Sequence, residues 1–116
     1  MLHIGVEPVG QGEVNVVVRG ELDCATAGQL RAAITAVLNR GGIHAIGLDL
    51  RGLAFLDSTG VGTLVVAHRI CHQVGVRLRL TAVSAFAAQL LAAVGVDTAL
   101  GLPAAPGEPA ALAASR

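Results

Sequence analysis

The chain contains no lysine, tryptophan or tyrosine, and its aromatic residues are two phenylalanines. A core with so few aromatic rings must consist mainly of Val, Leu, Ile and Ala side chains. Without lysine, the chain cannot form a nucleotide-binding P-loop, because that motif needs its lysine to reach the phosphates. The two cysteines are too few for a disulfide framework, so we expect reduced thiols.

Charge is also scarce: 14% of the 116 residues are charged, and eight arginines balance eight acidic residues. A net charge of zero gives no electrostatic attraction to nucleic acid or to an anionic membrane. The longest uncharged segment, residues 80–96, is barely long enough to cross a bilayer and contains polar residues. The first ten residues lack the basic start and long apolar run of a signal peptide. We therefore expect a cytoplasmic protein with one folded domain.

Four segments alternate apolar residues with polar residues or glycine, which is the pattern of half-buried strands. Residues 2–6 and 14–18 flank a turn rich in Pro and Gly, so we predict that they pair as an antiparallel hairpin. Residues 44–50 and 76–80 are the third and fourth predicted strands, and residues 51–56 are predicted to be a link.

Three segments have helical periodicity instead. The first has one apolar face, formed by Leu30, Ala33, Ile34, Val37 and Leu38. Gly41 can end this helix by adopting the left-handed backbone conformation. The second covers residues 61–74 and ends at Gly75. The third begins after a cap at Ser84, ends at Gly95, and carries apolar residues that are Phe86, Leu90, Leu91 and Val94.

The predicted order is strand, strand, helix, strand, helix, strand, helix. Strands separated by one helix pair in parallel through right-handed crossovers. We therefore predict a single α/β domain over residues 1–102, with a mixed sheet (an N-terminal antiparallel hairpin, then parallel strands) and three to four helices. Residues 100–102 can add a short edge segment, and the Pro/Ala-rich residues 103–116 are expected to be a disordered tail.

Arginine side chains mark one face of the fourth predicted strand. Arg77 and Arg79 alternate with apolar residues, which indicates that helices do not cover both faces of the sheet. Such a solvated strand face is the simpler interpretation, and binding of an anion or an acidic partner by this pair is the alternative.

The segment FLDSTGVG, residues 55–62, places Ser58 and two glycines between the third strand and the second helix. A nucleophile elbow needs glycine two residues before its serine, and Leu56 stands there, so a serine hydrolase is disfavoured. Gly60 and Gly62 could let a phosphate approach the backbone. The G-x-G-x-x-G pattern is absent, however, so nucleotide binding is also disfavoured.

Two uses of Ser58 remain open. Either Asp57 or Ser58 can cap the helix, but a cap does not explain the glycines, each of which costs up to about 1 kcal/mol relative to alanine. Alternatively, Ser58 is phosphorylated: a helix N-terminus stabilises the phosphate, while its charge of about −1.5 to −2 beside Asp57 repels a docked partner.

Two blocks of the sequence resemble the signature of STAS domains, in particular bacterial anti-sigma-factor antagonists. The blocks are RGELDCATAGQL (residues 19–30) and LDLRGLAFLDSTGVGTLV (residues 48–65), and the resemblance runs from about Val14 to Leu102. It implies a small α/β domain with a mixed sheet, in agreement with the predicted element order.

The resemblance also implies a function. In the family, the serine of D-S-[ST]-G is phosphorylated by an anti-sigma factor that is a serine kinase of the histidine-kinase-like ATPase fold. Unphosphorylated antagonist binds that factor and frees the sigma factor, and a PP2C-type phosphatase restores this state. By position the acceptor is Ser58, in a protein that is not an enzyme and needs no cofactor. The implied partner-binding residues are Asp23, Asp57, Thr59, Gly60, Val61 and Gly62.

Related STAS proteins imply an alternative: a scaffold or accessory subunit, in a stressosome or a lipid-transport complex, that binds partners without a Ser58 switch. The third predicted helix has no charged residue, which also leaves a homodimer open.

Two further groups of residues have a structural and a functional interpretation. His68 and His72 have the i, i+4 spacing of a zinc site, with Cys71 between them, but Arg69 stands where the zincin motif has glutamate. We expect packed side chains there and no metal. Asp23 would contact a partner, place charge at the start of the first helix, or do both, with Thr26 as the expected cap.

Overall fold

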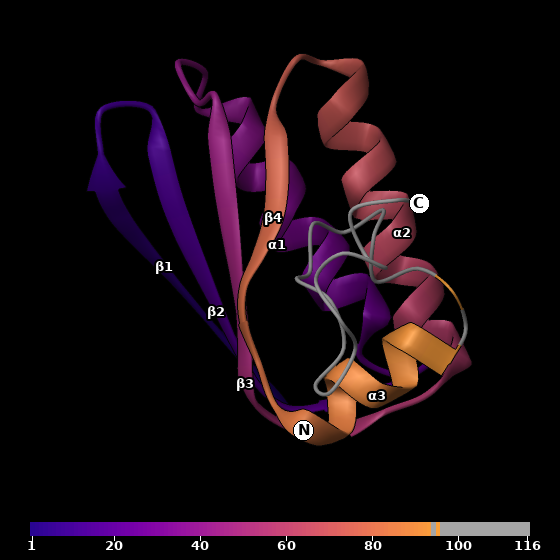
Figure 1. The fold of residues 1–116 in the computed structure, drawn as a ribbon. Coiled ribbons are helices and arrows are strands. Elements are labelled where there is room, and N and C mark those ends of the chain that lie inside the picture. Colours follow the sequence, from indigo (N-terminus) through magenta and orange to yellow (C-terminus); the bar gives the residue numbers. More distant parts are fainter. Residues whose placement is uncertain (94, 96–116) are drawn as a thin grey trace, which may run out of the picture.

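The computed structural model describes residues 1–93 and 95, which form one sheet and helices packed against it (Figure 1). The elements in chain order are β1 (Leu2–Gly10), β2 (Glu13–Leu22), α1 (Ala27–Asn39), β3 (Ala45–Leu56), α2 (Ser58–Gln73), β4 (Arg77–Val83) and α3 (Ala85–Ala93). The strand order is β1-β2-β3-β4; β1 and β2 pair antiparallel, and the other two pairings are parallel. The predicted mixed α/β sheet and N-terminal hairpin are confirmed.

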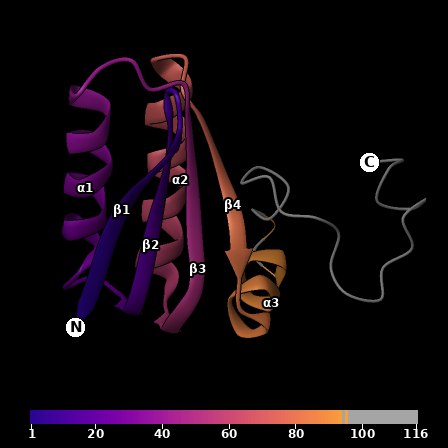
Figure 2. The same cartoon turned by 90° about the vertical axis from the view of Figure 1, so that its left-hand side faces the viewer.

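Figure 2 shows α1 and α2 on one side of the sheet and α3 at the end of β4. Cross-strand rows of aliphatic side chains face α1 and α2, because the register aligns the alternating apolar positions of the inner strands. Those rows are Val14–Ile46–Leu78 and Val16–Leu48–Leu80, and all six side chains are buried.

The opposite face of the sheet carries small and polar side chains. Arg77 and Arg79 are exposed on it, in the rows of Ala45 and Gly47. The side chains of Asn15 and Thr81 lean over Gly47 from the two neighbouring strands, where a Cβ would meet them at 2.5 and 2.6 Å. Among residues 1–93, helices therefore leave part of this face uncovered, as predicted.

Strand β3 is longer than its sequence pattern predicts. Residues 51–56, expected to be a link, continue the strand, because Gly52–Leu53 and Phe55–Leu56 still pair with β2. Register shifts interrupt this pairing on both sides of residues 19–20, so the simple alternation of apolar residues is lost there.

The helix ends follow the predicted glycines. Gly41 and Gly75 have φ of +74° and +77°, which favours glycine after a helix. The Ser84 hydroxyl accepts from the Ala87 N–H at 3.2 Å, as expected of the α3 cap. In α3, Ala87 and Leu91 are buried whereas Phe86 is 48% exposed.

Several expectations fall outside the described residues: Val94 on the third helix, the edge segment at residues 100–102, and the tail at residues 103–116. Within the described part of the chain, no helix is both long enough and apolar enough to cross a membrane.

Candidate functional site

The two STAS-like sequence blocks, residues 19–30 and 48–65, meet at the carboxyl ends of β2 and β3. These strands are parallel and end on the paired residues Leu22 and Leu56. The Asp57 N–H then donates to the Leu22 carbonyl oxygen at 3.4 Å. The chain segments that leave the two strands, residues 23–26 and 57–60, therefore start side by side, at the edge where parallel α/β sheets usually bind ligands.

Asp57 caps helix α2. Its backbone is extended, and its carboxylate accepts from the Gly60 N–H at 2.8 Å. Ser58 is the first helical residue, is exposed, and its hydroxyl makes no hydrogen bond within the described part of the chain. The choice between the two candidate caps is thus decided for Asp57, and the Ser58 hydroxyl is free for another use. Helix α2 begins at residue 58 instead of the expected 61, because the cap precedes both glycines.

The two glycines of this first part of α2 have different surroundings. Gly60 is buried, and a Cβ there would lie 2.6 Å from the Leu22 carbonyl oxygen and 2.7 Å from a methyl group of Leu56. Gly60 therefore lets the helix approach the end of β2. Gly62 is exposed, and a Cβ there would meet only open space. Internal packing explains Gly60 and does not explain Gly62.

Asp23 organises the neighbouring loop. Its carboxylate accepts from the Ala25 and Thr26 N–H groups at 3.0 and 3.1 Å. Thr26 stands at the N-cap position of α1, but its side chain makes no capping hydrogen bond, so the expected cap is wrong in that respect. The buried Thr26 hydroxyl instead donates to the Glu21 carbonyl at 2.8 Å and accepts from the Asp23 N–H at 3.0 Å. The result is a fixed loop beside the Ser58 turn.

A family model described as "Mlab, STAS domain" matches residues 9–103. The chain belongs to the STAS domain family. An anti-sigma F factor antagonist from Lysinibacillus sphaericus is 38% identical over 64 residues, which is 55% of this chain and 55% of that protein. The match thus spans about half the length of the curated relative.

Solved structures also resemble this STAS domain. An anti-sigma factor antagonist from Mycobacterium paratuberculosis has a TM-score of 0.77 and 27% identity, covering 98% of this chain and 93% of that one. The antagonist SpoIIAA in its unphosphorylated form has a TM-score of 0.57 and 31% identity, covering 67% and 71%. The Bacillus SpoIIAA in its phosphorylated form has a TM-score of 0.66 and 25% identity, covering 98% and 100%.

The residues that the STAS resemblance implied for partner binding differ in exposure. Ser58, Thr59 and Gly62 are exposed, Asp23 and Asp57 are half-buried, and Gly60 and Val61 are buried. The exposed members offer atoms to a partner directly. Contact of Gly60 and Val61 with a partner stays a prediction, beside the packing role that their burial gives them.

Charge at this end of the STAS domain is acidic. Residues 20–30 and 52–67 contain Glu21, Asp23 and Asp57 and no arginine. The Met1 amino group pairs with Glu21 at 2.7 Å, so within the described residues Asp23 and Asp57 are the acidic groups there without a cationic partner. A phosphate on Ser58 would have no arginine in either segment to pair with, and it would stand beside the Asp57 carboxylate.

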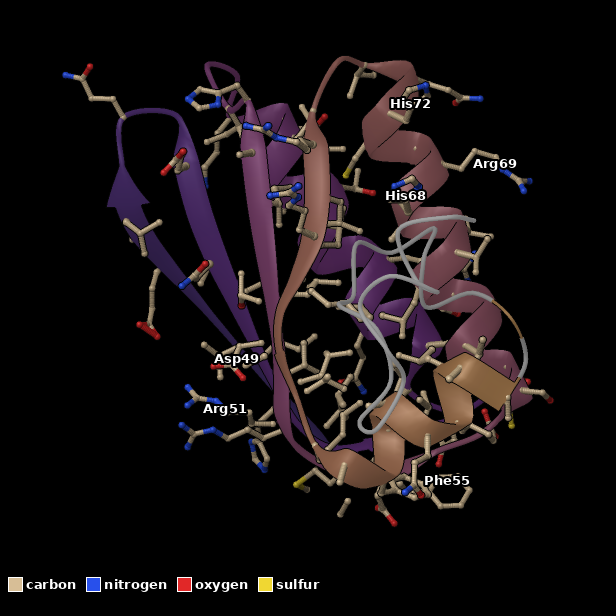
Figure 3. All side chains as sticks on the ribbon, in the orientation of Figure 1. Asp49, Arg51, Phe55, His68, Arg69 and His72 are labelled. Atoms are coloured by element: carbon tan, nitrogen blue, oxygen red, sulfur yellow. The ribbon has the colours of Figure 1, made fainter. Side chains whose placement is uncertain are left out.

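The histidines of α2 lie away from this end of the STAS domain (Figure 3). The rings of His68 and His72 stack with centroids 6.5 Å apart, whereas Cys71 is buried in the core. Burial raises the pKa of the Cys71 thiol, which keeps it protonated. His68 is only half-buried, less than expected. No group of three His, Cys, Asp or Glu side chains in the described residues could hold a metal ion.

Two exposed residues near the turn were missed at the level of sequence. Cys24 is exposed in the Asp23 loop, and Phe55 is exposed on the last part of β3. The sequence pattern predicts a link over residues 51–56, whereas Phe55 lies on a strand with its side chain exposed. Extending the register past Leu50 without a shift would pair Glu21 with Leu53. The two register shifts that bring Phe55 opposite Glu21 left no signal in the sequence.

Proposed function

We propose that this STAS domain is an anti-sigma-factor antagonist whose binding to a serine-kinase anti-sigma factor is switched by phosphorylation of Ser58. One observation supports this above the others: the exposed Ser58 hydroxyl starts α2 while Asp57 makes the cap. The hydroxyl is therefore accessible and can be modified without removing the bond that begins the helix. The names of the similar proteins agree with this function.

In the proposed mechanism, the anti-sigma factor supplies both the kinase fold and ATP, so the chain is a substrate and needs no cofactor of its own. The Ser58 oxygen attacks the γ-phosphorus of ATP, the bond to ADP breaks, and the serine proton passes to a base of the kinase. A PP2C-type phosphatase returns the phosphate to water and restores the hydroxyl.

The phosphate changes binding more than folding. It sits at a helix N-terminus, where unpaired N–H groups and the helix dipole stabilise an anion. It also adds a charge of about −1.5 to −2 beside Asp57 on an acidic surface. A partner docked on Ser58, Thr59 and Gly62 would meet both bulk and repulsion. Unphosphorylated protein would hold the anti-sigma factor and leave its sigma factor free.

The proposal is tested by intact-mass measurement after incubation with ATP and each kinase-type anti-sigma factor of the source organism. We expect one added phosphate on the wild type and none on Ser58→Ala, with Thr59→Ala as the matched control that keeps the acceptor. Binding should persist in Ser58→Ala and be lost in Ser58→Asp. Failure of every active kinase to modify the wild type would overturn the proposal.

A second candidate is a STAS scaffold or accessory subunit without a Ser58 switch. The family model that matches residues 9–103 is described as "Mlab, STAS domain", a description that names no anti-sigma factor. This second candidate predicts stable assemblies that Ser58→Asp leaves intact. Size-exclusion chromatography of wild type and Ser58→Asp with candidate partners separates the two functions.

A further inference from the structure

Both aromatic residues of the chain are exposed in a protein whose buried core is aliphatic. Phe55 is 44% exposed and Phe86 is 48% exposed. The fold does not use either ring as a core residue, although phenylalanine is among the residues most often buried. Aromatic side chains left at a surface are typical of protein interfaces, where they supply a large apolar area.

The two rings come from elements that meet at the Ser58 end of the molecule. Phe55 pairs with Glu21 on the last but one rung between β2 and β3, and Ser58 follows three residues later. Phe86 lies in the first turn of α3, a helix that contacts β3. Figure 3 shows Phe55 at the end of the molecule where α3 lies.

Of the other exposed large apolar residues, Met1 also lies at this end, because its amino group pairs with Glu21 at 2.7 Å. Val9 lies beside the β1–β2 turn, at the opposite end of the sheet. Val66 lies on the outer side of α2, and Val74 lies at the far end of that helix from Ser58. They are single aliphatic side chains, which are normal on a protein surface. Both phenylalanines therefore lie at the end of the molecule that carries Ser58.

The acidic side chains near Phe55 indicate which charge a partner surface should carry. Asp23 and Asp57 flank the strand ends beside Phe55. Glu21, opposite Phe55, is paired with the Met1 amino group at 2.7 Å, so the acidic charge open to a partner is that of Asp23 and Asp57. A complementary surface would hold an apolar pocket for the rings and basic groups around its rim.

We propose that Phe55 and Phe86 are aromatic anchors that insert into an apolar, basic-rimmed pocket of the anti-sigma factor. This rests on the proposed function of the Ser58 turn and adds a second source of affinity to it. The anchors make the same contact before and during phosphoryl transfer, so they supply binding and not chemistry. The affinity supplied by the two rings is too small to keep the complex together once Ser58 carries a phosphate.

The test measures the affinity of the anti-sigma factor for unphosphorylated wild type, Phe55→Ala, Phe86→Ala and the matched control Val74→Ala. Each phenylalanine variant should weaken binding at least about tenfold, as truncation of an interface anchor does. Val74→Ala should bind within about twofold of wild type. In phosphorylation assays the phenylalanine variants should raise KM and leave kcat unchanged. Urea denaturation should show that all four proteins are folded.

The outcomes are distinguishable. Wild-type affinity in both phenylalanine variants, with binding still abolished by Ser58→Asp, overturns the anchors and leaves the proposed function standing. A wild type that neither binds nor is phosphorylated overturns both. If Phe55→Ala converts a dimer to a monomer in analytical ultracentrifugation without changing partner affinity, the rings serve a second copy of the chain, and the proposal is wrong.

Discussion

At the scale of single residues, three neighbours in one turn have three separate tasks. Asp57 makes the capping hydrogen bond, Ser58 presents a free hydroxyl, and Gly60 lets the helix touch the end of β2. Because the cap and the proposed phosphorylation site are different residues, each can be changed without the other. The proposed switch would benefit from that separation, because a phosphate on Ser58 would leave the Asp57 capping bond in place.

Replacing Asp57 by alanine should lower the free energy of unfolding by about 1 kcal/mol, because the Gly60 N–H loses its acceptor. Asp57→Asn keeps an oxygen acceptor and should recover most of the loss. Ser58→Ala is the neighbouring control and should change stability by less than about 0.5 kcal/mol. Urea titration of the three variants checks this, and a larger loss in Ser58→Ala than in Asp57→Ala would show that the cap is assigned wrongly.

At the scale of elements, the first turns of helix α2 contain two glycines, which have low helix propensity. Gly60 is required by its contact with the carbonyl of Leu22, whereas Gly62 faces open space and weakens the helix without a packing reason. Gly28, near the start of α1, also faces open space and is exposed. Gly28 is therefore a control for Gly62: both are exposed helical glycines, but only Gly62 lies on the helix that carries Ser58.

Gly62→Ala and Gly28→Ala should each raise the free energy of unfolding by about 0.5–1 kcal/mol, the difference in helix propensity. If Gly62 is kept so that a partner can approach closely, only Gly62→Ala should weaken binding of the anti-sigma factor. Thermal denaturation and titration calorimetry measure the two effects. Equal affinities of both variants would contradict a contact role for Gly62.

At the scale of the whole molecule, helices α1 and α2 cover one face of the sheet and leave an acidic and basic surface on the other (Figure 2). On that face Arg51 donates to the Asp49 carboxylate at 2.8 Å, and the two side chains lie together on β3 (Figure 3). The hydrogen bond from the Arg51 guanidinium holds the pKa of Asp49 below its usual range.

This pair predicts a pH dependence of stability. A carboxylate with a lowered folded-state pKa stabilises the fold above its unfolded pKa of about 3.9, and that contribution is lost as pH falls through the folded-state value. Asp49→Asn should therefore be less stable than wild type at neutral pH, with the difference shrinking as pH falls below about 4. Arg51→Ala should give a similar profile. Urea titrations across this range check it; a constant difference would contradict the pairing.

Local patterns in the sequence determined the element types, the antiparallel hairpin, the parallel order and the glycines that end α1 and α2. Alternation, helical periodicity and left-handed glycine are properties of neighbouring residues, so no tertiary information is needed to recognise them. The position of Ser58 between a strand and a helix could be determined in the same way.

Only the tertiary structure decided the details on which the candidate site depends. The choice of Asp57 over Ser58 as the cap needs the backbone angles and the distance to the Gly60 N–H. The extension of β3 through Phe55 comes from pairing with a strand more than 30 residues away, which outweighs the irregular local pattern. The exposure of both phenylalanines depends on packing between distant segments, because burial is set by what covers a side chain and not by its own identity.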